Sequence, residues 1–230
     1  LLTGEIGKTY TVKDGKLFRQ HFNNGSLITK DGKLTQSYSK IHLVPFGEWF
    51  PYSDSFPFLV PLLDSMGASK FSPGDKPSLF TLNGRKFGAL ICYEGIFHRL
   101  CRKYKRMGAD YLVNITNDGW SDSFAGHMQH YVASVFRALE NGIWYVRAGN
   151  TGRSGVIDPF GRLKKEMPML EPNSMTADLD FRLNRTTIYE KVGDVMLYIA
   201  LIFLIFLSIL YVKMHITLRM QKKQETYGPN

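Results

Sequence analysis

The chain has 230 residues and a formal net charge of +9, from 29 lysine and arginine residues against 20 aspartate and glutamate residues. This length can bury a full hydrophobic core, and the apolar fraction of 44% is ordinary for a folded protein. The two cysteines, Cys92 and Cys101, exclude a disulfide framework, and their spacing fits no zinc motif. The basic excess favours an anionic partner, either a nucleic acid or a membrane surface.

The first part of the chain is predicted to form short strands separated by turns. Pairs such as Asp14-Gly15 and Asn83-Gly84 mark turns because these residue types tolerate the backbone angles that turns require. The strands are predicted at residues 1–4, 16–22, 26–29, 78–82 and 87–92, and turns at 14–15, 24–25, 31–32 and 83–84.

Helical patterns alternate with strands from residue 96 onward. Helices are predicted at 96–107 and 127–141, and Gly142 closes the second one. Further strands are predicted at 111–115, 143–148, 155–158 and 174–179. Cys101 falls in the first helix among basic residues, and we expect it to be structural. Strands that alternate with helices indicate an α/β fold.

Residues 195–212 form an uncharged and strongly apolar run. As a helix, the run would span roughly 27 Å, close to the thickness of the hydrocarbon core of a bilayer. Tyr198 and Tyr211 lie near its ends, as interfacial aromatic residues do. A buried core helix is the alternative. This run, and the lack of any aromatic–basic pattern of the kind that RNA-binding modules show, favour a membrane over a nucleic acid as the partner.

Cys92 follows the short apolar run Gly-Ala-Leu-Ile and precedes Glu94 by two positions. A thiol at the end of a buried strand and beside ionisable groups is suitably placed for a nucleophile. The alternative is a buried structural thiol, because free cysteine is among the most buried residue types. This segment alone leaves both interpretations open.

Lys40 and Glu48 enclose a segment in which Pro45 and Gly47 break regular structure, so we expect both charges on one loop. A lysine near a carbonyl under attack can stabilise the developing oxyanion, and a cation near a thiol raises the thiolate fraction. The alternative is that Lys40 and Glu48 are solvated surface charges, the usual fate of both residue types.

A polar loop with Asn117, Asp118 and Trp120 follows the strand predicted at 111–115. In α/β folds ligands bind at the carboxyl ends of strands, so this loop and Cys92 are predicted to share one site. An Asx turn with a packing tryptophan is the alternative. His127 and His130 lie one helical turn apart, but two histidines are weak evidence for a metal, and we expect no metal and no cofactor.

Six sequence blocks follow one another between residues 40 and 154. They are Lys-Ile-His-Leu-Val-Pro-Phe-Gly-Glu (40–48), Ile-Cys-Tyr-Glu (91–94), Asn-Ile-Thr-Asn-Asp-Gly-Trp (114–120), Gln-His (129–130), Arg-Ala-Leu-Glu-Asn (137–141) and Arg-Ala-Gly-Asn-Thr-Gly-Arg-Ser (147–154). In order and composition the blocks resemble apolipoprotein N-acyltransferases, which belong to the nitrilase, or carbon–nitrogen hydrolase, superfamily. The resemblance covers residues 1–180, and the apolar run fits it as well.

The resemblance implies a nitrilase-like αββα sandwich, here partial, on the periplasmic side of a bacterial inner membrane. Several transmembrane helices precede the domain in this family and one follows it. The enzymes transfer an acyl chain from a phospholipid, through a cysteine thioester, to the N-terminal amine of a diacylglyceryl-cysteine apolipoprotein. We therefore expect a catalytic domain at 1–182, a linker at 183–194, a transmembrane helix at 195–212 and a basic cytoplasmic tail at 213–230.

By position, Cys92 matches the family's nucleophile, Lys40 its catalytic lysine and Glu48 a further glutamate needed for activity. Tyr93 and Glu94 follow the nucleophile as they do in the family, and we expect them, with Asn117 and Trp120, to support substrate binding. The partners so implied are a phospholipid donor, an apolipoprotein acceptor and the membrane, with no nucleic acid.

This chain departs from the family pattern in two places. Ser-Asp-Ser follows Trp120 where the family usually has Phe-Gly. His98 stands near the position at which the family usually has a proline. The family's general-base glutamate lies upstream of the lysine, in a part of the domain that precedes Leu1. We therefore expect this chain alone to be an incomplete enzyme. A membrane-tethered amidase and an inactive lipid-binding remnant are the alternative functions.

Overall fold

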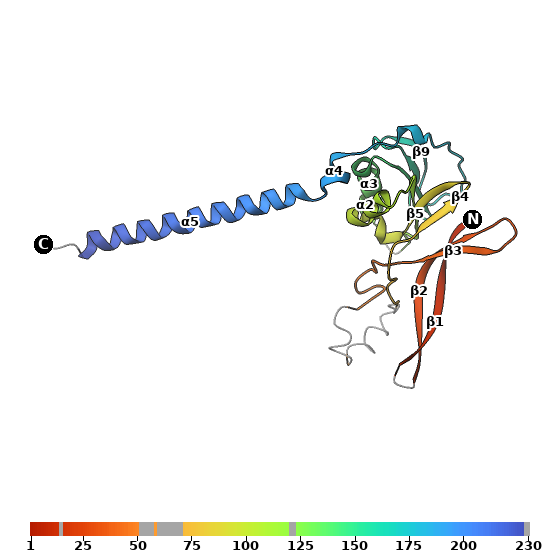
Figure 1. The fold of residues 1–230 in the computed structure, drawn as a ribbon, viewed down its shortest axis with the longest axis horizontal. Helices are drawn as coiled ribbons and strands as arrows, with labels where there is room; N and C mark the ends of the chain where they lie inside the picture. The colour runs from red at the N-terminus through yellow and green to blue at the C-terminus, as the bar shows by residue number, and fades with distance from the viewer. Residues whose placement is uncertain (14–15, 51–57, 59–70, 120–122, 228–230) are drawn as a thin grey trace. The chain divides into compact units, whose positions relative to one another are not determined.

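The computed structural model describes residues 1–13, 16–50, 58, 71–119 and 123–227 (Figure 1). The chain divides into two compact units, Leu1–Glu190 and Lys191–Asn230. The strands are β1 Leu2–Lys13, β2 Lys16–Ile28, β3 Leu34–Ser39, β4 Leu79–Leu82, β5 Arg85–Ile91, β6 Tyr111–Thr116, β7 Trp144–Gly149, β8 Ser154–Ile157 and β9 Leu163–Met167. The helices are η2 Cys92–Ile96, α2 His98–Arg106, α3 Phe124–Asn141, η3 Phe181–Leu183, α4 Ile188–Val192 and α5 Val195–Tyr227.

The first three strands form an antiparallel sheet in the order β1-β2-β3. The β1–β2 hairpin is longer than the short strands predicted, and the predicted turn at Asn24-Gly25 is wrong. Asn24 pairs with Glu5 on one side and Ser39 on the other, within β2. Strand neighbours on both sides therefore override the local turn preference of an Asn-Gly pair.

The second sheet has six strands in the order β4-β5-β6-β7-β8-β9. Strands β5, β6 and β7 run parallel, whereas the remaining neighbours are antiparallel. The hairpin predicted around Asn83-Gly84 is confirmed: φ is 49° at Asn83 and 75° at Gly84, the positive values that a two-residue turn of type I′ requires. Parallel pairing brings the carboxyl ends of β5 and β6 to one edge of the sheet.

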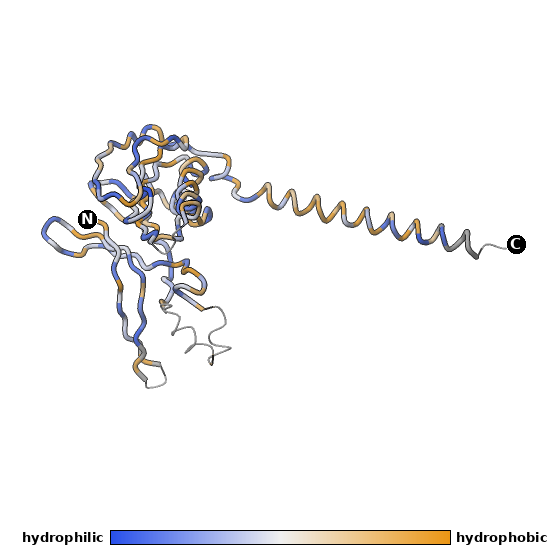
Figure 2. Tube along the Cα trace, turned by 180° about the vertical axis from the view of Figure 1, so that it is seen from behind, coloured by the Kyte–Doolittle hydropathy of each residue, from blue (hydrophilic) through white to orange (hydrophobic). Residues whose placement is uncertain are grey.

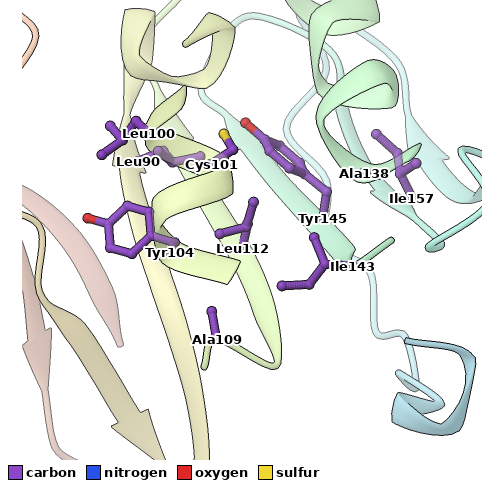
Figure 3. Close-up of a cluster of buried hydrophobic side chains, with 10 residues drawn as sticks. All are labelled: Leu90, Leu100, Cys101, Tyr104, Ala109, Leu112, Ala138, Ile143, Tyr145 and Ile157. Carbon is purple, nitrogen blue, oxygen red and sulfur yellow. The ribbon is translucent and has the colours of Figure 1, made fainter. Parts of the chain in front are cut away.

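Helices cover one face of the six-stranded sheet. On this face, Leu90 of β5 and Leu112 of β6 pack with residues of α2 and α3 in the cluster that Figure 3 shows. Gly88 lets α2 approach the sheet closely, because a Cβ at this position would lie 2.4 Å from the Tyr104 ring. The buried thiol of Cys101 belongs to the same cluster, which confirms its structural role.

The opposite face of the six-stranded sheet packs on the three-stranded sheet. This second cluster joins β2 and β3 to β4 and β5 through the buried side chains of Leu27, Tyr38, Phe80, Phe87, Ala89 and Ile91. Odd and even positions of a strand point to opposite sides of the sheet, so β5 buries both of its faces, whereas β6 buries one face and partly buries the other. The first unit is therefore an α/β sandwich with layers in the order helix, sheet, sheet, as the predicted partial αββα fold requires.

Two predicted elements near the end of the first unit need comment. Helix α3 ends before Gly142, as predicted, and Gly142 adopts the left-handed conformation with φ of 57°. The strand predicted at 174–179 is wrong: this segment has no strand pairing, and β9, which the sequence pattern missed, forms the described edge of the sheet beside β8. The alternation of apolar and polar residues in 174–179 is typical of a strand, but this segment has no neighbouring strand to pair with.

The second unit consists mainly of α5. The helix begins at Val195, as predicted, and continues past Val212 to Tyr227. Within it, 195–220 is long and apolar enough to cross a membrane: its most apolar stretch of 18 residues has a mean hydropathy of 2.8, and none of the residues of that stretch is buried inside the protein. Figure 2 shows the hydrophobic first part of the helix and the more polar residues that follow. The alternative of a buried core helix is therefore wrong for this structure.

Candidate active site

Cys92 is the first residue after β5 and begins the short helix η2. Its φ of 50° lies in the left-handed region that residues other than glycine rarely adopt. Such a conformation costs of order 1–3 kcal/mol, and strained residues of this kind cluster at functional sites. The side chain is partly exposed, and its Sγ lies 4.0 Å from the backbone oxygen of Asn117. The interpretation of Cys92 as a sealed structural thiol is therefore wrong.

The carbonyl group of Cys92 is held from two sides. Asn114 donates to it from Nδ2 at 3.2 Å, and His130 Nε2 lies 3.1 Å from the same oxygen. Asn114 comes from β6, directly beside β5, and His130 comes from α3. The neighbouring strand and the covering helix thus both brace the strained turn on which the thiol sits.

Asp118 is at the centre of a buried charge network behind this turn. Its carboxylate accepts a hydrogen bond from Arg147 Nη2 at 2.6 Å and lies 2.9 Å from His130 Nδ1. Burial would raise the pKa of Asp118, but the hydrogen bond with His130 and the charge of Arg147 outweigh it and lower the pKa to about 2. The carboxylate is therefore ionised at neutral pH and compensates the buried guanidinium.

His130 lies between two oxygen atoms that can only accept hydrogen bonds. One is the ionised carboxylate of Asp118 and the other is the carbonyl of Cys92. The Nδ1 atom of His130 also lies 3.2 Å from Nη2 of Arg147. His130 thus connects the carbonyl group of Cys92 to the Asp118–Arg147 ion pair behind the turn.

Lys40 is fully buried and forms an ion pair with Glu48. Its Nζ lies 2.7 Å from Oε2 and 2.9 Å from Oε1 of the carboxylate. Glu48 also accepts from the backbone N–H of Val44 at 2.8 Å and from Asn23 Nδ2 at 2.9 Å. The prediction that Lys40 and Glu48 share a loop is confirmed, and the alternative of two solvated surface charges is wrong.

Glu94 is buried beneath the same turn and accepts four hydrogen bonds. Oε1 receives Tyr38 Oη at 2.7 Å and the backbone N–H groups of Ile41 and His42, and Oε2 receives that of Ile91 at 2.9 Å. Burial raises the pKa of Glu94, and the four donors oppose that rise. Glu94 connects the segment after Lys40 to β5, which ends just before Cys92.

A cavity of about 1330 Å³ opens beside the thiol. Cys92, Tyr93, Glu48, Asn117 and His130 are among its lining residues. Ligand pockets commonly measure about 300–1,000 Å³, so this one can take a large substrate. The predicted shared site of Cys92 and the loop after β6 is thus confirmed for Asn117, whereas Trp120 lies outside the described residues.

The sequence did not predict how the two histidines are used. Among the described residues no group of three or more potential ligands could hold a metal ion. His127 Nε2 instead lies 2.9 Å from the backbone oxygen of Asp118, and His130 joins the charge network. Arg147 and Tyr38 were not predicted as site residues. Arg147 does begin one of the six blocks, and this was the one available signal.

Comparison with known proteins identifies the class of protein. The sequence matches the carbon–nitrogen hydrolase family over residues 2–189, and the chain belongs to this family. It resembles in fold the NitN amidase from Nesterenkonia sp. AN1, with a TM-score of 0.54 at 21% identity over 84% of this chain and 67% of that one. At this identity the likeness concerns the fold alone, and it confirms the predicted nitrilase-like sandwich.

Curated relatives are more specific. The chain is 34% identical to apolipoprotein N-acyltransferase 2 of Treponema denticola over 88% of this chain and 39% of the relative. It is 36% identical to apolipoprotein N-acyltransferase of Geobacter metallireducens, over 83% and 36%, and 32% identical to that of Rickettsia prowazekii, over 91% and 41%. The resemblance carried by the six blocks is thus confirmed, and the chain spans about two fifths of the length of these relatives.

Proposed function

We propose that this chain is part of an apolipoprotein N-acyltransferase. The donor would be a phospholipid and the acceptor the N-terminal amine of a diacylglyceryl-cysteine apolipoprotein. The observation that carries the proposal is the strained, partly exposed Cys92 at the edge of a large cavity that Glu48 also lines. The sequence blocks that carry the resemblance to this family lie at these same residues.

The first half-reaction forms a thioester. The Cys92 thiolate attacks the carbonyl carbon of the phospholipid ester, and the bond from that carbon to the glycerol oxygen breaks. The lysophospholipid leaves as an alcohol after it takes up a proton. Lys40 and the backbone N–H of Tyr93 stabilise the oxyanion. The family resemblance assigns the thiol proton to a glutamate upstream of this chain.

The second half-reaction transfers the acyl group. The acceptor amine attacks the thioester carbonyl, an amide bond forms, and the carbon–sulfur bond breaks to return the thiolate. Glu48 holds Lys40 in place through both half-reactions. Tyr93, Glu94 and Asn117 are proposed to support the site, and Trp120 is proposed to contact substrate.

The proposed location is a bacterial inner membrane, with the catalytic unit on the periplasmic side. The apolar helix within 195–220 supports membrane insertion. Lys213, Arg219, Lys222 and Lys223 follow its most apolar part, whereas Arg182, Arg185 and Lys191 precede it. This slight excess of cations after the span favours a cytoplasmic tail.

The test is intact-mass analysis of the complete protein after incubation with phospholipid. We expect an adduct with the mass of one acyl chain, which is absent from Cys92→Ser and present in the matched variant Cys101→Ser. Cys101 is the right control because it is the other cysteine and lies fully buried in α2. A protein that forms no adduct, or one that forms it equally in both variants, would contradict the proposal.

The acceptor is tested in a second step. Addition of a diacylglyceryl-cysteine peptide should discharge the adduct and yield an N-acylated peptide. If water discharges the adduct at the same rate and free fatty acid accumulates, the protein is a membrane-tethered hydrolase instead. Failure of residues 1–230 alone, with success of the complete protein, would agree with a general base upstream of Leu1.

A further inference from the structure

The β1–β2 hairpin extends beyond the body of the first unit (Figure 1). Strand β3 pairs with β2 only at Asn24–Ile28. Toward the turn, the last described contact on the outer edge of β2 is the bond from the backbone N–H of Ser72 to the oxygen of His21. We call the part from this contact to the turn, residues 8–13 and 16–21, the distal hairpin. Among the described residues its two strands pair only with each other.

One face of the distal hairpin carries exposed apolar side chains. Val12 pairs with Leu17, and the two are 72% and 67% exposed. The next pair on the same face is Tyr10, 58% exposed, with Arg19, and the pair after that is Lys8 with His21. Directly opposed residues share a face, and alternate pairs along the strands return to it.

The same face is a core face where the hairpin meets the body. Leu2 and Leu27 form a pair in the same alternation, and Leu27 is buried in the core between the sheets. In the distal hairpin this face still carries apolar side chains, although they are exposed among the described residues. Exposed apolar side chains gathered in this way mark a surface that contacts a partner.

The residues of this face are graded along the strands. On this face the apolar pair Val12 and Leu17 is nearest the turn, and the pair Lys13 and Lys16 follows it one step closer to the turn. Tyrosine and arginine lie about 7 Å further in, and Lys8 about 14 Å further in. Figure 2 shows hydrophobic residues near the described end of the hairpin. A segment inserted into a bilayer places apolar residues in the acyl region, aromatic residues at the interface and cationic residues at the headgroups. The residues of this face follow the same order.

The positive charge of this segment favours an anionic lipid as the partner. Residues 8–21 contain four lysine and arginine residues and a single aspartate. Each cation near an anionic membrane surface contributes about 1 kcal/mol, which is about fivefold in an equilibrium. The chain also carries a helix able to cross a bilayer, so a membrane surface is a partner that stays close to this unit.

We propose that the distal hairpin inserts its apolar end into the surface of an anionic lipid bilayer. Strand β1 also lines the site cavity through Leu2, Thr3 and Gly4. From Leu2 to Val12 the strand rises about 34 Å, so the inserted hairpin would hold the cavity within that distance of the lipid. The inference concerns lipid contact and does not depend on acyl transfer.

The test uses a fluorophore that reports the polarity of its surroundings. It is attached at Val12→Cys in the complete Cys92→Ser protein, where the remaining thiol, Cys101, is fully buried. The protein is placed in nanodiscs of phosphatidylcholine, with or without phosphatidylglycerol. We expect emission at shorter wavelength with phosphatidylglycerol, and quenching by lipids that carry a nitroxide on the acyl chain. A label at Lys33→Cys, on the exposed β2–β3 turn, should show neither change.

A variant with fewer positive charges distinguishes contact with lipid from coverage of this face by another part of the protein. With both Lys8 and Arg19 changed to Gln, the ratio of lipid-quenched to unquenched label should fall about fivefold for each cation removed. The matched variant with Lys30 and Lys33 changed to Gln should leave it unchanged. A label at position 12 that is as open to iodide as the label at position 33 overturns the proposal. So does protection that persists in lipid-free amphipol, since another part of the protein would then cover this face.

Discussion

The substitution Asp118→Asn tests whether the buried charge network supports the turn that carries Cys92. The variant keeps the shape of the side chain and removes its charge. Arg147 is then left buried with no compensating anion at 2.6 Å. Breaking a buried ion pair in this way costs about 3–5 kcal/mol, and we expect a loss of unfolding free energy of this size at pH 7.

Part of this loss must depend on pH. The pKa of Asp118 is lowered from 3.8 to about 2 in the folded protein, which corresponds to about 2 kcal/mol. A carboxyl group with a lowered pKa stabilises the fold fully at pH values above its unfolded pKa, near 4, and loses this contribution as the pH falls towards 2. The difference between parent and variant should therefore shrink by about 1 kcal/mol between pH 7 and pH 3, and by about 2 kcal/mol at pH 2.

The measurement is urea unfolding of the detergent-solubilised chain, followed by tryptophan fluorescence at several pH values. Asp178→Asn is the matched control because Asp178 is exposed, and it should change the unfolding free energy by no more than about 0.5 kcal/mol. A difference between parent and Asp118→Asn that is below about 1 kcal/mol at pH 7, or that does not vary with pH, would refute the ionised, charge-compensating role of Asp118.

Two further substitutions test the packing around the site. Gly152→Ala would place a Cβ 1.8 Å from Asp118 Oδ2, so we expect a loss of at least about 2 kcal/mol in urea unfolding, whereas Gly4→Ala, whose nearest neighbour would be 3.9 Å away, should be tolerated. Tyr38→Phe removes a hydrogen bond to buried Glu94 and should cost about 1–3 kcal/mol, the penalty for a buried acceptor that loses a partner. Unfolding midpoints equal to that of the parent would show that Gly152 has room for a methyl group, or that Glu94 does not need the phenol.

Local chemistry accounts for the elements that were predicted correctly. The Asn83-Gly84 pair formed its turn because both residues accept positive φ, and Gly142 ended α3 for the same reason. The apolar run from Val195 formed a helix from its composition alone. Turn and cap preferences act within a few residues, so they can be predicted without knowledge of the rest of the chain.

Pairing partners distant in the sequence explain the elements that were predicted wrongly. Asn24-Gly25 has the composition of a turn, but strands on both sides hold it in β2. The segment 174–179 has the alternation of a strand but lacks a neighbour to pair with. A strand is stable only with a hydrogen-bonded partner, and the sequence of one segment does not contain that information.

The sequence by itself determined the nucleophile candidate, its companions Lys40 and Glu48, and the family, because these depend on residue identity and order. Only the tertiary structure decided that Lys40 is buried and paired, and that Asp118, His130 and Arg147 form one network behind Cys92. The residues of that network lie in the loop after β6, on α3 and on β7, and the parallel register of β6 and β7 brings them together. Burial and charge compensation are properties of three-dimensional proximity, which no local pattern in the chain specifies.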